Sequence, residues 1–426
     1  MRSFSSLLVA SFVVFAALGS AQEYQPASIQ FTGASDYSDQ ELLAAAQLKP
    51  GISLSVDAMK AHAKILLDTG VFSNITFQFT GVDLRYVLTP STNLLPVRLT
   101  NLPLAAGKDL DAKIHDRVPL YHGKVPADSG LMEQIRAALE QILAAQGVKA
   151  TVQAVATAGA VPGGVGTVNF SIASPPVVVG DIQLDKKSPA IDPGADRILK
   201  KLTGSPYDLE GSSSQIATYL GNYYHDKGYV EAHAESTPLA AHATPDLIQI
   251  PFQVSISPGI QYHLGDIRFA TDLMTTHADF DHQSAVHFGD TADGQRLTDD
   301  WQYIARQYHN HGYMQASIHP TPSFDRFKGL VSYDVTAEPG PIYTMGKLTI
   351  ENVTDDLRAS ILAAWKVPPG AVFNEGAVRS FFAVTTVGGP QSALERVFAT
   401  ANVKYTQLLN DETHSVDVTI RLEKKQ

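Results

Sequence analysis

The chain of 426 residues contains no cysteine. This absence excludes disulfide bonds, thiol nucleophiles and thiolate metal ligands. It also excludes a lipoprotein anchor, which requires a cysteine at the mature N-terminus. Basic residues are few as well, because 32 lysines and arginines stand against 43 aspartates and glutamates, for a net charge of -11. A nucleic-acid-binding protein needs a basic surface, so this class of function is disfavoured.

Long apolar runs are missing beyond the N-terminus. Arg2, the apolar run 7–18 and the small residues Gly19 and Ala21 predict a signal peptide over residues 1–21, cleaved after Ala21. An uncleaved membrane anchor is the alternative, but the run is shorter than the roughly 20 residues that a spanning helix needs. We therefore expect a mature protein that is soluble in an export compartment.

What the sequence does contain is a repeat. A break at Pro339-Gly340 is followed by an alternating strand with a glycine near its start, and the same phrase begins at Pro258-Gly259. A weaker copy follows Pro175-Pro176. The strand glycines Gly180, Gly265 and Gly346 lie about eighty residues apart, a period typical of a domain array. A glycine followed by an apolar residue keeps the same period at four expected helix ends: Gly70-Val71, Gly147-Val148, Gly228-Tyr229 and Gly312-Tyr313.

The phrase EPGPIYTMGKLTI and the pair HDKGYVEA and NHGYMQAS resemble the POTRA domain. This polypeptide-transport-associated module precedes outer-membrane assembly barrels of the BamA type. The resemblance implies an α+β fold: a tandem array of β-α-α-β-β domains, each a three-stranded mixed sheet with two helices on one face. It also implies a periplasmic location, and strands Ile75–Phe79 and Leu84–Leu88 alternate as such a sheet requires.

The period divides the chain after the signal peptide into five POTRA-like domains. Their expected bounds are 22–90, 91–175, 176–259, 260–340 and 341–426, and the last domain is divergent. The segment 387–390 interrupts its expected second helix. After the alternating final strand that ends near Leu422 too little sequence remains for a transmembrane barrel, so we expect a barrel-less protein.

Local signals place several helices. Ser38 and Glu41 form a capping box at the first helix, and a stripe of leucine and isoleucine predicts a helix over 131–146. The fourth domain has a clear helix over 297–310, built on Trp301, but its first helix has no clear pattern. The small residues 158–166 predict a flexible hairpin tip with no function of its own.

Side chains that might carry chemistry are better explained by structure. Five histidines invite a metal hypothesis: His277, His282, His287, His309 and His311. The first three occupy a loop-like stretch and the last two point to different helix faces, so we predict solvated histidines and no metal or other cofactor. The acid pairs Asp299-Asp300 and Asp355-Asp356 are expected in the first turns of helices, where the helix dipole favours carboxylates. We predict no catalytic site.

The expected binding elements are edge strands, whose unpaired backbone groups can accept an extended peptide. The strands after the two Gly-Tyr pairs, 230–236 and 314–318, are short and mixed in polarity. Protection of these edges by neighbouring domains is the alternative. The candidate peptide-binding residues are Val230, Ala232, Ala234, Met314, Gln315, Ala316, Ser317 and Ile318.

These features predict a non-enzymatic periplasmic scaffold that binds polypeptides in outer-membrane protein assembly or transport. Its expected partners are a separate outer-membrane barrel protein or unfolded outer-membrane clients, through which it is peripheral to the outer membrane. One alternative is an envelope-biogenesis or secretion adaptor that binds a folded partner. A periplasmic enzyme or metal-binding protein is the alternative of a different class, for which the sequence offers no matching motif.

Overall fold

The computed structural model describes residues 23–104, 108–159, 166–186, 188–189, 192–271, 273–383 and 401–424. The predicted signal peptide at 1–21 lies outside these residues, as do the interruption at 387–390 and most of the hairpin tip at 158–166. No helix in the described ranges combines the length and apolar character that a membrane span requires.

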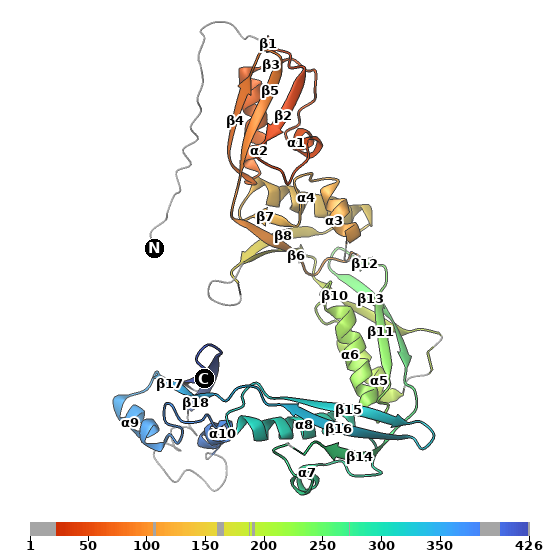
Figure 1. Cartoon of the computed structure of the whole chain (residues 1–426). Helices are drawn as coiled ribbons and strands as arrows, with labels where there is room; N and C mark the ends of the chain where they lie inside the picture. Colours follow the sequence, from red (N-terminus) through yellow and green to blue (C-terminus); the bar gives the residue numbers. More distant parts are fainter. Residues whose placement is uncertain are drawn as a thin grey trace. The chain divides into compact units, whose positions relative to one another are not determined.

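Five sheets of the described chain repeat one arrangement, in which the last strand of each repeat lies in the centre of its sheet (Figure 1). That central strand runs parallel to the first strand of its repeat. The strands are β2 (Ser28–Thr32), β4 (Phe72–Phe79) and β5 (Asp83–Pro90); β6 (Leu94–Leu99), β7 (Lys124–Pro126), β8 (Thr151–Thr157) and β9 (Thr167–Ser174); β10 (Val177–Leu184), β11 (His233–Pro238), β12 (His242–Ala243) and β13 (Ile248–Ser257); β14 (His263–Phe269), β15 (Ser317–Asp325) and β16 (Leu330–Glu338); β17 (Thr344–Glu351), β18 (Ala401–Asn410) and β19 (Ser415–Lys424). A short ladder pairs β1 (Glu23–Tyr24) with β3 (Leu54–Ser55).

Helices follow the first strand of each repeat. They are α1 (Asp39–Ala45), α2 (Val56–Asp68), α3 (Lys108–His115), α4 (Gly130–Ala145), α5 (Pro193–Leu202), α6 (Ser212–His225), α7 (His277–Gln283), α8 (Gly294–His309), α9 (Asp355–Ala364) and α10 (Glu375–Ala383). The predicted α+β fold with mixed sheets is confirmed, but the second and third sheets have four strands, not the expected three, because β7 and β12 add to them.

The central strands explain why the helices cover one face. Along β19, Val416, Val418 and Ile420 are fully buried while the residues between them are more exposed, so one face of the strand meets a core. That core includes Phe373 and Val378 from the helical side of the fifth sheet. The fourth sheet has a separate core of its own around Tyr262 and Ile304.

The chain divides into two compact units. The first comprises residues 1–220 and 234–255, and the second comprises 221–233 and 256–426. The end of α6 and the turn after it thus belong with the fourth and fifth sheets, although the rest of α6 belongs to the first unit.

The strand glycines lie at β-bulges. The parallel register shifts between Leu264 and Ile267 and again between Met345 and Leu348. A Cβ on Gly265 would lie 2.4 Å from the Ser332 hydroxyl, so a larger residue does not fit beside the partner strand. The close approach has a purpose, because that hydroxyl accepts a 3.0 Å hydrogen bond from the Asp266 amide.

Two expectations about the fourth domain are wrong. His277 and His282 lie on a helix, α7, which Thr276 caps through the amide of Asp279. Asp299 and Asp300 lie inside α8, not in its first turn, because the helix begins at Gly294 with Asp293 as its cap. The pair Asp355-Asp356 does lie in the first turn of α9, as predicted.

Candidate functional site

The candidate strand of the third domain begins later than the sequence suggested. β11 starts at His233, so Val230 and Ala232 lie in the turn after α6 and only Ala234 is in the strand. The turn forms because Gly228 takes a φ of 83° and the Ala232 amide donates to the carbonyl of Tyr229 at 2.9 Å. The strand assignment is therefore wrong for Val230 and Ala232.

The fourth domain shows the same displacement. β15 starts at Ser317 and includes Ile318, whereas Met314, Gln315 and Ala316 precede it. Gly312 has a φ of 87°, and the Ala316 amide donates to the Tyr313 carbonyl at 3.1 Å. A local turn therefore uses the backbone that was expected to extend the sheet edge, and the strand assignment is wrong for Met314, Gln315 and Ala316.

The displaced apolar residues have a different role. Val230 packs against the core of the fourth sheet, and Met314 packs against the core of the fifth. The side-chain amide of Gln315 donates a hydrogen bond to the Asp411 carboxylate at 3.0 Å. These side chains therefore hold a turn against the next domain.

Each turn is fastened by a three-residue arrangement that we call a joint clasp. In the first clasp, Tyr262 and Arg326 both donate hydrogen bonds to the Glu231 carboxylate. In the second, the Tyr343 hydroxyl donates to Asp411 at 2.6 Å beside the bond from Gln315. The tyrosine amides donate in turn to the carbonyls of Gly228 and Gly312, each at 2.8 Å.

The clasps shift the ionisation of their members. Hydrogen bonds from Arg326 and Tyr262 lower the pKa of the Glu231 carboxyl. Loss of hydration and the hydrogen bond to Glu231 raise the pKa of Tyr262. The hydrogen bond to Asp411, together with lost hydration, raises the pKa of Tyr343 to about 12. Both tyrosines therefore stay neutral donors at physiological pH.

The outer side of β11 offers backbone groups to a partner. β11 is the last strand on its side of the third sheet in the described residues. Just after it, the backbone amide of Leu239 donates to the Pro251 carbonyl on β13 at 2.8 Å. In an antiparallel pair, the backbone groups of successive residues point alternately toward the partner strand and away from it. The amides of Ala234 and Ser236 therefore point outward. Pro238, which has no amide hydrogen, falls in the same outward row.

β15 is also the outer strand of its described sheet, but its edge is interrupted. Pro320 and Pro322 pair opposite Val335 and Tyr333 on β16. Because proline cannot donate to a ladder, both residues belong to the row that faces away from β16. Ile318 lies two residues before Pro320 and belongs to the same outward row, so its amide is an outward donor at the start of the strand. Beyond it the edge is blunted, because the next two residues of that row are prolines without an amide hydrogen.

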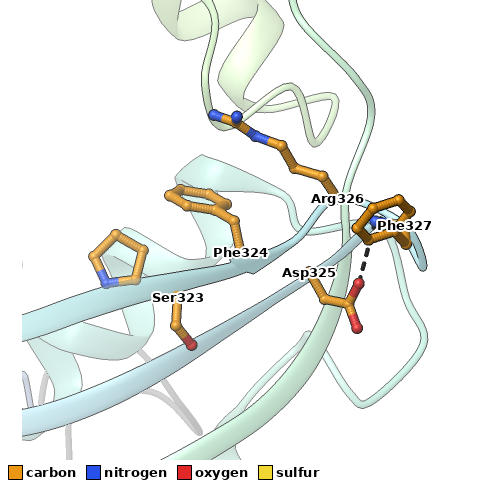
Figure 2. A pocket seen from close by; sticks show the side chains of 6 residues that line it. Ser323, Phe324, Asp325, Arg326 and Phe327 are labelled. Atoms are coloured by element: carbon orange, nitrogen blue, oxygen red, sulfur yellow. Dashed lines mark hydrogen bonds between the residues drawn. The ribbon is translucent and has the colours of Figure 1, made fainter.

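An apolar hairpin tip joins β15 to β16. Phe327 is fully exposed, and Phe324 is 39% exposed. Figure 2 shows Asp325 accepting the Phe327 amide at 3.1 Å, in a hollow lined by residues 322–327. Arg326 extends from the same tip and donates a hydrogen bond to Glu231 of the first clasp. This bond ties the hairpin tip to the turn after α6.

The five histidines considered for metal binding have structural contacts or lie at the surface. His277 contacts the Ile267 carbonyl at 2.8 Å, and His309 contacts Glu375 at 3.1 Å. Across the described ranges, the histidines and carboxylates that converge are Glu41, His115 and His122. No short motif predicted this group, because Glu41 lies in the first repeat and both histidines lie in the second.

The comparison that identifies a domain falls on the fourth repeat. Residues 262–340 match the POTRA family model, whose description is "Surface antigen variable number repeat". The chain carries a POTRA domain. This match spans β14 to the end of β16, so it covers the fourth sheet, formed by β14, β16 and β15. No curated protein sequence matches the chain.

Several solved structures are similar to this chain. BamA POTRA3–5 of Haemophilus influenzae is 17% identical over 58% of this chain and 96% of that one, with a TM-score of 0.43. POTRA1–3 of the periplasmic domain of Omp85 from Anabaena is 13% identical over 58% and 96%, with a TM-score of 0.23. CdiB from Escherichia coli is 13% identical over 56% and 37%, with a TM-score of 0.20.

Proposed function

We propose that this protein is a non-enzymatic periplasmic scaffold that binds polypeptides during outer-membrane protein assembly or transport. It works beside a separate outer-membrane barrel protein, and its clients are extended segments of outer-membrane proteins. The POTRA match over 262–340 supports this role, because the module is associated with polypeptide transport. The five domains bounded at 22–90, 91–175, 176–259, 260–340 and 341–426 form its working array.

One observation carries the proposal: β11 presents outward amides at Ala234 and Ser236 on an outer strand. An extended client that pairs there gains backbone hydrogen bonds whatever its sequence, while alternate side chains add weak specificity. The start of β15, at Ser317 and Ile318, provides a shorter second edge. Pro320 and Pro322 prevent that pairing from extending along the strand.

A proline scan at the outward positions tests this site. Ala234→Pro removes one outward donor and leaves the inward row that faces β13, so we expect peptide affinity to fall by tenfold or more. Ala234→Val keeps the amide and is the matched control. The probes are peptides copied from strands of an outer-membrane barrel, titrated against each variant by fluorescence anisotropy.

The folding control is the circular dichroism melting curve of each variant, which must keep the midpoint of the parent protein. Ile318→Pro with Ile318→Val applies the same comparison to β15. If folded Ala234→Pro and Ala234→Val bind all peptides as the parent does, strand addition at β11 is refuted.

A second candidate function is an adaptor that docks a folded envelope protein. The observation in its favour is the fully exposed Phe327 at the hairpin tip, since large exposed aromatic side chains are typical of interaction surfaces. A photocrosslinking residue placed at Ala234 or at Phe327 in the native envelope separates the two functions. Barrel precursors captured at Ala234 support the scaffold, whereas a folded partner captured only at Phe327 supports the adaptor.

A further inference from the structure

Three metal-ligating side chains converge where the first two repeats meet. Glu41 comes from α1, His115 from the end of α3, and His122 from the loop before β7. The Nε2 atoms of His115 and His122 lie 3.2 and 3.0 Å from the same oxygen, Oε1 of Glu41. One ligand atom from each residue lies within 4.8 Å of the others. All three residues belong to the first compact unit.

The Glu41 carboxylate is oriented by its own helix. Its Oε2 accepts the Ser38 amide at 2.6 Å and the Ser38 hydroxyl at 2.8 Å, as the capping box requires. This leaves Oε1 directed at the two imidazoles. Partial burial raises the pKa of Glu41, but the hydrogen bonds from Ser38 and His122 outweigh that effect and lower it overall. The group is a carboxylate at neutral pH.

The ring of His115 is oriented so that its Nε2 faces Glu41. Its Nδ1 lies 3.1 Å from the Tyr121 carbonyl oxygen, which can only accept, so Nδ1 carries the hydrogen. Nε2 is therefore the ring nitrogen available to a cation, and it lies 3.2 Å from Oε1 of Glu41.

Tyr121 adds a further layer of support. Its hydroxyl donates to Asp111 at 2.8 Å, so the residue whose carbonyl orients His115 is itself held. Metal-binding histidines usually donate their other ring N–H to a carbonyl or carboxylate, which fixes the tautomer. The Asp111, Tyr121 and His115 series has that form, whereas the exposed His282 on α7 shows no such chain of contacts.

We propose that Glu41, His115 and His122 bind one divalent transition-metal ion of the zinc type. Two imidazole nitrogens and one carboxylate oxygen are a donor set that Zn²⁺ takes with a water in the fourth position. Bonds of about 2.1 Å in a tetrahedron place ligand atoms about 3.4 Å apart, near the two separations to Glu41. The histidine side chains are 38% exposed and Glu41 is 19% exposed, so an ion can enter from solvent.

The ion would tie the first repeat to the second. Glu41 lies in the predicted domain 22–90, while both histidines lie in the domain 91–175. Because the ligands come from both sides, the metal fixes the joint between them, and removing it leaves the two imidazoles and the carboxylate held by hydrogen bonds alone. The site is structural and independent of peptide capture at β11.

The test uses the chelator-treated mature chain, residues 22–426, titrated with Zn²⁺ by calorimetry at pH 7.5. We expect one tight site per chain, and His115→Ala and His122→Ala each to weaken it by at least tenfold. Glu41→Gln, which retains an acceptor for the Ser38 cap, should weaken it as well. His282→Ala is the matched control and should leave Zn²⁺ affinity unchanged.

Two further readouts do not depend on calorimetry. Co²⁺ should give the intense visible absorption of a tetrahedral site in the parent protein, and this band should be lost in His122→Ala. Zn²⁺ should raise the melting midpoint of the parent and not that of folded His122→Ala. No Zn²⁺ uptake by the parent, or uptake that survives both histidine substitutions, would overturn the proposal.

Discussion

Asp300 is a buried carboxylate inside α8, although the sequence predicted it in the first turn of a helix. It is only 6% exposed and accepts a 2.7 Å hydrogen bond from Ser284. An aspartate that is free in water has a pKa of 3.8. Loss of hydration raises the pKa of Asp300 above that value, although the hydrogen bond from Ser284 acts in the opposite direction. The cost of ionising this group inside the protein makes it a pH-dependent weak point of the POTRA domain.

The first prediction follows from the direction of this shift. Because folding raises the pKa of Asp300, the folded protein binds this proton more tightly than the unfolded chain, so ionisation weakens the fold as pH rises above 3.8. Asp300→Asn keeps an acceptor for Ser284 without the charge. We expect its stability relative to the parent to improve between pH 4 and pH 7.5, measured by urea unfolding with tryptophan fluorescence. The exposed Asp299→Asn should show a smaller change, and equal changes for both would contradict the assignment.

Trp301 supplies a second prediction at the same scale. Its ring is part-buried, lies 5.9 Å from Phe280 in a stacked arrangement and 5.4 Å from Tyr333. Full burial of an aromatic ring would make removal cost more, so we expect Trp301→Ala to destabilise this domain by about 2 to 3 kcal/mol. The measurement is chemical unfolding followed by circular dichroism. A midpoint equal to the parent's would show that the ring contributes only surface contacts.

At the scale of elements, the strand bulges depend on glycine and on the residue opposite. The Ser332 hydroxyl accepts the Asp266 amide, and in the fifth sheet the Asp417 carboxylate accepts the Lys347 amide at 2.6 Å. A side chain on the central strand thus satisfies an amide that the bulge removes from the ladder. Glycine is needed because a Cβ would occupy the path of that side chain.

We therefore expect Gly265→Ala to destabilise the POTRA domain by about 1 to 3 kcal/mol, since it displaces Ser332 and leaves the Asp266 amide unpaired. The matched control is Gly221→Ala on α6, where an added Cβ meets nothing within 4 Å. That change should be neutral or stabilising, because alanine favours a helix. Thermal unfolding of both variants measures the contrast, and a Gly265→Ala midpoint at or above the parent's would contradict the role of the bulge.

Local patterns predicted these elements where the information lies within a few residues. The Ser38 capping box and the alternation of β19 both follow from contacts or periods within short stretches of sequence. The starts of β11 and β15 were misjudged because Val230 and Met314 look like strand residues. Their apolar side chains pack on the core of the following repeat, and a single-domain pattern does not carry that information.

The same reasoning explains what was missed in the candidate sites. The edge-strand hypothesis pointed to segments at or beside outer strands of their described sheets, but it did not give the row of outward amides, which depends on hydrogen-bond alternation and on Pro320. The convergence of Glu41 with two histidines joins residues about eighty positions apart in the chain. No spacing rule for short motifs reaches that far.

For the whole molecule, the compact units do not coincide with the expected repeats. Residues 221–233 belong with the second unit, although the domain bounded at 176–259 would contain them. Val230 and Glu231 from this segment contact the core and the hairpin of the fourth sheet. A cut at Gly259 therefore removes part of the packing of the POTRA domain.

We expect residues 260–426 to fold as a fragment but to unfold at a lower temperature than residues 221–426. The longer fragment retains Val230 and the first clasp, and the shorter one does not. Circular dichroism melting of both fragments gives the comparison. Glu231→Ala in the longer fragment should lower its melting midpoint part of the way toward that of the shorter fragment. Identical midpoints would show that the segment adds nothing to the stability of the unit.

The two joint clasps also differ in the sign of their charges, which has a consequence for how such an array can evolve. The first sets an acid on the turn against a base on the hairpin, Glu231 with Arg326, whereas the second sets a neutral amide against an acid, Gln315 with Asp411. If the two hairpins were exchanged, Glu231 would meet Asp411, and two carboxylates would face each other without a cation. At this joint, the acid on the turn therefore favours a domain whose hairpin carries a base and disfavours one whose hairpin carries an acid.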